Sequence, residues 1–156
     1  MKKSITILAL CLTCMAVLTG CGGKKADKSV SVDTKKLCES LTETISGDLN
    51  TVNDDLIAST YFIDMEKVEE SAAALNSGAS ACEVAVIKCK DAAYTSEVEE
   101  LFKNRIKTQS DLFADYNAPE VAKLESAILS KTGNYVVFCV TDDHDAAEKL
   151  VKEAGF

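Results

Sequence analysis

Two hydrophobic spacings divide the sequence into predicted helices and strands. Apolar residues three and four positions apart, the spacing of an amphipathic helix, mark three segments. The first runs from about Thr34 to Ser46, and the last follows a cap at Asp142 or Asp143. The longest, of about six turns, starts near Thr95 with a run of acidic residues and is stopped at residues 117–119. The sequence therefore predicts three amphipathic helices.

Continuous apolar runs predict buried strands. Ala81–Cys89 indicates a central strand, and Ser126–Val140 indicates a β-hairpin whose second strand, from Tyr135, is buried. Ser71–Leu75 fits either a helix, because of its alanines, or the first arm of another hairpin. Residues 50–61 show no clean period, and we expect a loop there with a helical turn.

These elements predict an α+β fold. We expect a small, mostly antiparallel sheet with a long amphipathic helix and a C-terminal helix packed on a face of it, after an N-terminal helix. The length of 156 residues, with 47% apolar and 27% charged residues, suits one domain. We place this single globular domain at residues 34–156.

The first 20 residues resemble a lipoprotein signal peptide. Lys2 and Lys3 precede the apolar run Ser4–Leu18, which is too short to span a membrane stably because that needs about 20 apolar residues. The run ends in Leu18-Thr19-Gly20-Cys21, the order of a bacterial lipobox. We expect cleavage before Cys21, acylation of its thiol, and anchoring on the extracytoplasmic face of the cell membrane. The alternative is an ordinary signal peptide that ends at a cysteine by chance.

Charge is divided unevenly along the chain. The formal net charge is −8, and without residues 1–20 the chain has 15 basic and 25 acidic residues, a net charge of −10. Residues 21–36 carry +3 and the remainder carries −13. Lysines beside a lipid anchor favour an anionic membrane surface, so we expect residues 21–33 to form a flexible tether. The acidic balance, with Arg105 as the only arginine, argues against nucleic acid as a partner.

Three polar side chains share a face of the long predicted helix with core residues. Arg105, Gln109 and Tyr116 are spaced to lie together. One interpretation is a pocket for a small anion or a peptide, in which Arg105 clamps a carboxylate and the other two orient the ligand. The alternative is a structural network, in which Arg105 pairs with an acid such as Glu83 or Asp91 and Tyr116 caps the helix end. We prefer the network because buried polar groups are usually satisfied.

Four cysteines lie in the predicted domain: Cys38, Cys82, Cys89 and Cys139. Cys82 and Cys89 are an odd number of residues apart, so on one regular strand they point to opposite faces and cannot bridge. We expect free buried thiols, because cysteine is among the most buried residue types. The alternatives are a Cys89–Cys139 disulfide or a disulfide between Cys38 and a sheet cysteine.

We find no sequence signature of catalysis or of a cofactor. His144, the only histidine, has Asp142, Asp143 and Asp145 beside it, but sequence neighbours rarely converge on one metal ion. A helix cap with solvated acids is the preferred interpretation. No nucleophile elbow, P-loop or dinucleotide fingerprint is present. We therefore expect no enzymatic activity, no metal and no cofactor.

Several motifs, taken in order, resemble bacterial lipoproteins of domain-of-unknown-function family 4358. The likeness covers roughly residues 61–151. It rests on Cys82–Lys88, then Arg105, Gln109, Phe113 and Tyr116, then Gly133–Val137 and Asp142-Asp143. The resemblance implies a Gram-positive extracytoplasmic lipoprotein and favours a strand at Ser71–Leu75. It implies no particular activity.

The sequence thus leads to one functional expectation and one alternative. We expect a membrane-anchored extracytoplasmic lipoprotein with a non-catalytic binding or interaction domain. Its partners would be membrane lipid, through acylated Cys21, and an envelope protein, a peptide or a small ligand. The alternative is a receptor for a small molecule or peptide that uses a polar pocket around Arg105.

Overall fold

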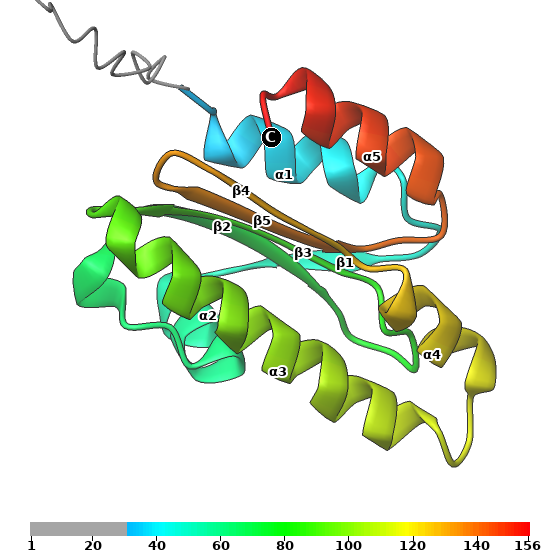
Figure 1. The fold of residues 1–156 in the computed structure, drawn as a ribbon. Helices are drawn as coiled ribbons and strands as arrows, with labels where there is room; N and C mark the ends of the chain where they lie inside the picture. The colour runs from blue at the N-terminus through cyan, green and yellow to red at the C-terminus, as the bar shows by residue number, and fades with distance from the viewer. Residues whose placement is uncertain (1–30) are drawn as a thin grey trace, which may run out of the picture.

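A computed structural model describes residues 31–156, so the predicted signal peptide, Cys21 and most of the predicted tether lie outside the described residues. The described chain contains a five-stranded sheet in the order β1-β2-β3-β5-β4, with every neighbouring pair antiparallel (Figure 1). The predicted α+β class is confirmed. The strands are β1 (Leu49–Val52), β2 (Val68–Asn76), β3 (Glu83–Cys89), β4 (Ile128–Thr132) and β5 (Tyr135–Val140).

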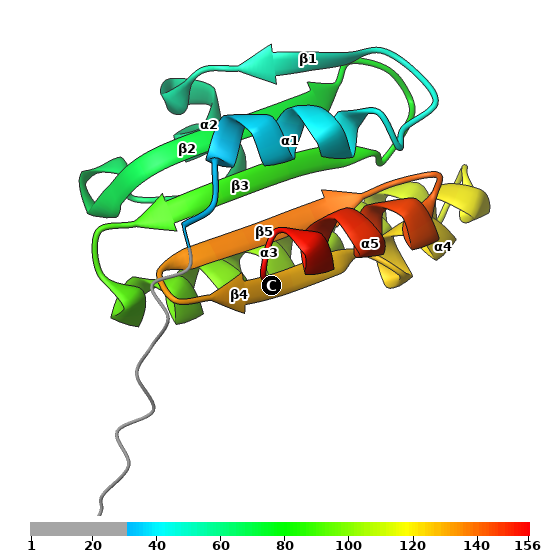
Figure 2. The same cartoon turned by 90° about the horizontal axis from the view of Figure 1, so that it is seen from above.

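Helices cover both faces of this sheet (Figures 1 and 2). Two lie on one face, α1 (Thr34–Thr42) and α5 (His144–Glu153). Three lie on the other, α2 (Asp54–Tyr61), α3 (Thr95–Phe113) and α4 (Ala118–Glu125). Two short 3-10 helices, Met65–Lys67 and Ala92–Tyr94, precede β2 and α3.

The sequence pattern suggested helices on one face, and the central strands explain the difference. Every residue of β5 is buried, as is every residue of β3 except the half-buried Lys88. The two strands pair directly, with Ala85 opposite Phe138. Because both strands are apolar on both sides, each face of the sheet needs a covering layer.

Ser71–Leu75 lies inside β2, so the strand interpretation is correct and the helix alternative is wrong. β2 pairs with β1 on one side and with β3 on the other. Ala72 and Ala74 belong to the core under α1, whereas Ala73 belongs to the core under α3. Pairing on both edges overrides the helical propensity of alanine, which is only a weak preference.

β1, α4 and the two 3-10 helices were not predicted, and the loop with a helical turn expected at residues 50–61 is instead occupied by most of β1 and the whole of α2. β1 has four residues with an exposed middle, so it carries no hydrophobic pattern. Asn53 caps α2, its side chain accepting a hydrogen bond from the Leu56 N–H at 3.0 Å. Pro119 does not stop the chain from being helical, because it lies in the first turn of α4, where backbone N–H groups have no partner within the helix.

The ends of the outer helices differ slightly from expectation. α1 ends at Thr42 rather than near Ser46. At the start of α5 the cap is Asp143, whose side chain accepts a hydrogen bond from the Ala146 N–H at 3.1 Å. Within residues 31–156 we find no helix with the length and apolar character that crossing a membrane requires.

Candidate functional site

Arg105 forms a two-point ion pair with Glu83. The Nε and Nη2 groups of Arg105 on α3 each donate to a different Glu83 oxygen at 3.0 Å. Glu83 opens β3 and is 3% exposed, whereas the Arg105 side chain is 24% exposed. The predicted pairing of Arg105 with an acid is therefore present, and Glu83 rather than Asp91 is the partner. Asp91 instead accepts from the Ala93 N–H at 2.8 Å.

A third group completes this buried network. The hydroxyl of Tyr61, at the end of α2, donates to Glu83 Oε2 at 3.1 Å. Burial raises the pKa of the Glu83 carboxyl, while hydrogen bonds from Arg105 and Tyr61 oppose that rise. Three elements, α2, β3 and α3, are thereby joined through one carboxylate.

Arg105 also lines an open groove with a volume of about 540 Å³. One wall is α3 and the other consists of the end of α2 and the connection from β2 to β3. Gln109 and Tyr116 line the same groove, so the three side chains selected from the sequence do lie along one surface. Tyr116 does not cap the helix with its hydroxyl. Its ring packs beside Phe113, with ring centroids 5.3 Å apart.

Exposed apolar side chains distinguish this groove. Phe62, Leu112 and Tyr116 are 80%, 56% and 60% exposed, and all three line it. Helical spacing puts Leu112 and Tyr116 on the apolar face of the predicted helix, but both are exposed, whereas Phe113 beside Leu112 is buried. Phe62 follows α2 with a left-handed backbone, φ 60°, which is uncommon for a residue with a bulky side chain. No sequence signal marked Phe62.

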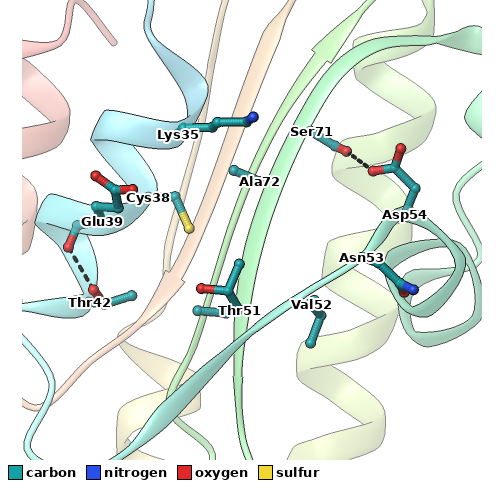
Figure 3. A pocket seen from close by; sticks show the side chains of 11 residues that line it. Lys35, Cys38, Glu39, Thr42, Thr51, Val52, Asn53, Asp54, Ser71 and Ala72 are labelled. Atoms are coloured by element: carbon teal, nitrogen blue, oxygen red, sulfur yellow. Dashed lines mark hydrogen bonds between the residues drawn. The ribbon is translucent and has the colours of Figure 1, made fainter.

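A second hollow, of about 480 Å³, lies between α1 and the β1–β2 edge of the sheet (Figure 3). The Cys38 thiol faces it from α1, opposite Thr51 of β1 and Ala72 of β2. At its rim Ser71 Oγ donates to Asp54 Oδ1 at 2.5 Å. Burial raises the pKa of the Cys38 thiol to about 11, which makes it a poor nucleophile. Its lining includes none of the strongly exposed apolar side chains found along α3.

Comparison with known proteins assigns a family. The family model described as "Domain of unknown function (DUF4358)" matches residues 43–141, which is more than half of the chain. The chain belongs to this family. No match was found among curated proteins or among solved structures. The matched segment of this DUF4358 protein contains every residue that lines the α3 groove, from Ser59 to Tyr116.

A second polar network holds the connection from β2 to β3 at the groove of the DUF4358 domain. Lys123 on α4 places its Nζ 2.9 Å from Glu120 Oε1 and 2.7 Å from Asp142 Oδ1. Glu120 Oε2 accepts from the Ala81 N–H at 2.6 Å, just before β3. Burial opposes ionisation of Glu120, but the Ala81 N–H and Lys123 outweigh it and lower the pKa. Sequence reasoning missed this network because it missed α4.

The four cysteines of the domain are free and buried, as predicted. Cys89 belongs to the core under α3 and Cys139 to the core under α1 and α5, so the proposed bridge between them would have to cross the sheet. Burial raises the pKa of the thiols of Cys89 to about 11 and of Cys139 to about 12. These are packing groups rather than nucleophiles.

Because the four cysteines are free, the number of thiols that react with an alkylating reagent can be predicted. Unfolding the mature protein without a reductant should expose Cys38, Cys82, Cys89 and Cys139 to iodoacetamide, because none has a disulfide partner. The mass of the intact protein should increase by four additions beyond any at Cys21. Prior reduction is the control, and it should add nothing. Two or four fewer additions without reduction would reveal disulfides and contradict the prediction.

His144 lies at the start of α5, on the opposite side of the sheet from the groove. No group of three or more histidine, cysteine or acidic side chains in residues 31–156 is arranged to hold a metal ion. Of the side chains in residues 31–156 that line the α3 groove, Arg105 and Glu83 are the charged ones and the rest are neutral, an arrangement suited to holding a ligand by contact.

Proposed function

We propose that this DUF4358 protein is a lipid-anchored extracytoplasmic lipoprotein whose folded domain binds a partner without catalysing a reaction. The leader and the Leu18-Thr19-Gly20-Cys21 sequence support the anchor. On this proposal, acyl chains on Cys21 hold the protein at the outer surface of a Gram-positive membrane. The basic residues 21–36 then lie near the lipid headgroups, and the acidic domain is held away from them.

The exposed apolar rim of the α3 groove is the observation that carries the binding proposal. Large apolar side chains grouped at a surface concavity are typical of interaction sites, whereas single exposed ones are ordinary. Phe62, Leu112 and Tyr116 come from two separate elements and surround the same hollow. The partner would be an envelope protein, a peptide or a small ligand.

The chemistry of the groove supports binding rather than catalysis. An activated nucleophile needs a base within hydrogen-bond reach and a suitable pKa. Cys82, the thiol in the groove lining, is 1% exposed, and burial raises its pKa despite a nearby lysine. Arg105 already pairs with the Glu83 carboxylate, which favours the structural interpretation of Arg105 over the clamp for a ligand carboxylate.

Lipid anchoring is tested by removing the acylated residue. Cys21→Ser should abolish membrane retention, because the thioether cannot form and the apolar run of the leader is too short to span stably. Fractionation of cells that express the variant, with metabolic labelling by a clickable fatty acid, measures this. Wild-type protein should be labelled and sediment with membranes. A variant cleaved before residue 21 that stayed on the membrane without label would refute the lipoprotein proposal.

Binding at the groove is tested by site-specific photocrosslinking in the native cell. A benzophenone amino acid at Leu112, at the groove rim, should form a discrete adduct after irradiation. The matched control replaces Leu56, which is also an exposed apolar residue at 44% exposure but does not line the groove. Equal adducts at both positions, or none at Leu112, would contradict a partner at this groove.

A further inference from the structure

The α3 groove is uncharged overall within an acidic protein. Only two charged side chains line it, Arg105 and Glu83, and they neutralise each other at 3.0 Å. Residues 37–156, which contain the groove, carry −13. An anionic ligand would meet this surrounding negative charge, and the cation that residues 31–156 place in the groove, Arg105, already pairs with Glu83, while a cationic ligand would meet the guanidinium before the buried carboxylate. Charge complementarity therefore selects a neutral ligand.

The polar groups of the groove retain unused hydrogen-bonding capacity. Among residues 31–156 we find no partner for the Gln109 carboxamide or for Nη1 of Arg105. A carboxamide offers an acceptor and two donors, so it can pair reciprocally with the C=O and N–H of a peptide unit. The free Arg105 N–H groups can donate to a second carbonyl. These groups match a polypeptide backbone.

The apolar groups of the groove match the apolar side chains of a peptide ligand. Leu112 lies in the last turn of α3 and Tyr116 follows three residues after the helix ends, and both line the groove with Phe62 on the opposite wall. Aliphatic Leu112 together with aromatic Phe62 and Tyr116 suits ligand side chains that are apolar and of varied shape. A neutral glycan would use the aromatic rings but would gain little from Leu112. The volume of about 540 Å³ is sufficient for a few residues.

We propose that the groove along α3 binds an uncharged, extended peptide segment with apolar side chains. Gln109 and Arg105 hydrogen-bond the backbone of the segment, and Phe62, Leu112 and Tyr116 hold its side chains. This proposal rests on the proposed binding function and specifies the chemistry of the ligand.

The test uses the full-length protein in phosphatidylcholine nanodiscs and an array of acetylated, amidated heptapeptides. Peptides with two or more apolar residues and no charge should bind, and placing glutamate or lysine beside those residues should abolish binding. Leu112→Ser should weaken binding about tenfold, because it removes one apolar anchor. Leu56→Ser, the matched exposed position outside the groove, should leave affinity unchanged.

Backbone recognition has a separate readout. N-methylation of a central amide in the best peptide removes one N–H and should weaken binding to the wild-type protein about tenfold. In Gln109→Ala the same methylation should have little further effect, because the proposed partner is gone. Circular dichroism of each variant checks that the fold is intact.

Three results would overturn the peptide proposal. These are charged peptides binding as well as neutral ones, binding that does not respond to Leu112→Ser, and Leu112-dependent binding of chitin oligosaccharides, used as the glycan probe, in place of peptides. If a Leu112 photocrosslink persists while no peptide binds, the binding function stands and only the peptide assignment fails. If the crosslink is also absent, the binding function itself fails.

Discussion

Replacing Phe102 with alanine is expected to lower the free energy of unfolding by about 3–5 kcal/mol, because it removes a large, fully buried side chain and leaves a cavity. Phe102 is 0% exposed and stands between two other buried rings. Its centroid lies 4.8 Å from the stacked ring of Phe138 and 5.1 Å from the edge-on ring of Tyr61. These contacts join α3 to β5 and α2. Urea denaturation of residues 31–156 measures the loss.

Phe102→Leu is the matched control for this substitution. Leucine keeps most of the apolar volume, so it should cost clearly less than alanine. Leu112→Ala, which removes an exposed apolar side chain from the same helix, should change the free energy of unfolding by less than about 0.5 kcal/mol. A loss below 1 kcal/mol for Phe102→Ala would contradict the central place of this ring in the core.

Arg105→Ala should lower the free energy of unfolding by about 2–4 kcal/mol, because it leaves the Glu83 carboxylate buried without its ionic partner. The partial exposure of Arg105 keeps the expected loss below that of a fully enclosed pair. Gln109→Ala on the same helix and Tyr116→Phe just beyond its end should each change the free energy of unfolding by less than about 0.5 kcal/mol. An unchanged urea midpoint for Arg105→Ala would contradict the structural role.

The loss caused by Arg105→Ala should depend on pH in a defined direction. Without Arg105, two of the effects that lower the pKa of Glu83 vanish while burial still raises it, so the folded-state pKa rises further above 4.5. A raised carboxyl pKa adds stability below the unfolded-state pKa and loses it as pH rises through the folded-state value. The deficit in the free energy of unfolding should therefore be larger at pH 7 than near pH 4.5.

The double variant Glu83→Leu with Arg105→Leu should recover much of the loss at pH 7, because no buried charge is left without a partner.

Long, strongly patterned elements were predictable from the sequence. α3, β3 and β5 carry continuous apolar faces or runs, and all three lie close to their predicted positions. Short elements were not. β1 becomes a strand through pairing with β2, and α4 is held by tertiary contacts such as that of Glu120 with Ala81, neither of which leaves a periodic pattern.

The candidate site was predictable in part for the same reason. Arg105 and Gln109 lie on α3 and Tyr116 follows soon after its end, so the spacing alone placed them near one another. The opposite wall depends on Phe62, whose position follows from a left-handed turn after an unpredicted helix. Leu112 is exposed while its neighbour Phe113 is buried, a difference that depends on the packing of the whole fold rather than on helical period alone.

The two polar networks have a consequence for the thermodynamics of binding. Residues 81–83 belong to the groove wall opposite α3, and hydrogen bonds hold both ends of this segment: the Ala81 N–H donates to Glu120, and the Glu83 carboxylate accepts from Arg105 and Tyr61. Because this wall is already ordered, binding a ligand does not require a loss of conformational entropy from the protein at this segment. The affinity of this groove should therefore be governed by how fast a ligand leaves, with association proceeding without a slow rearrangement of the protein.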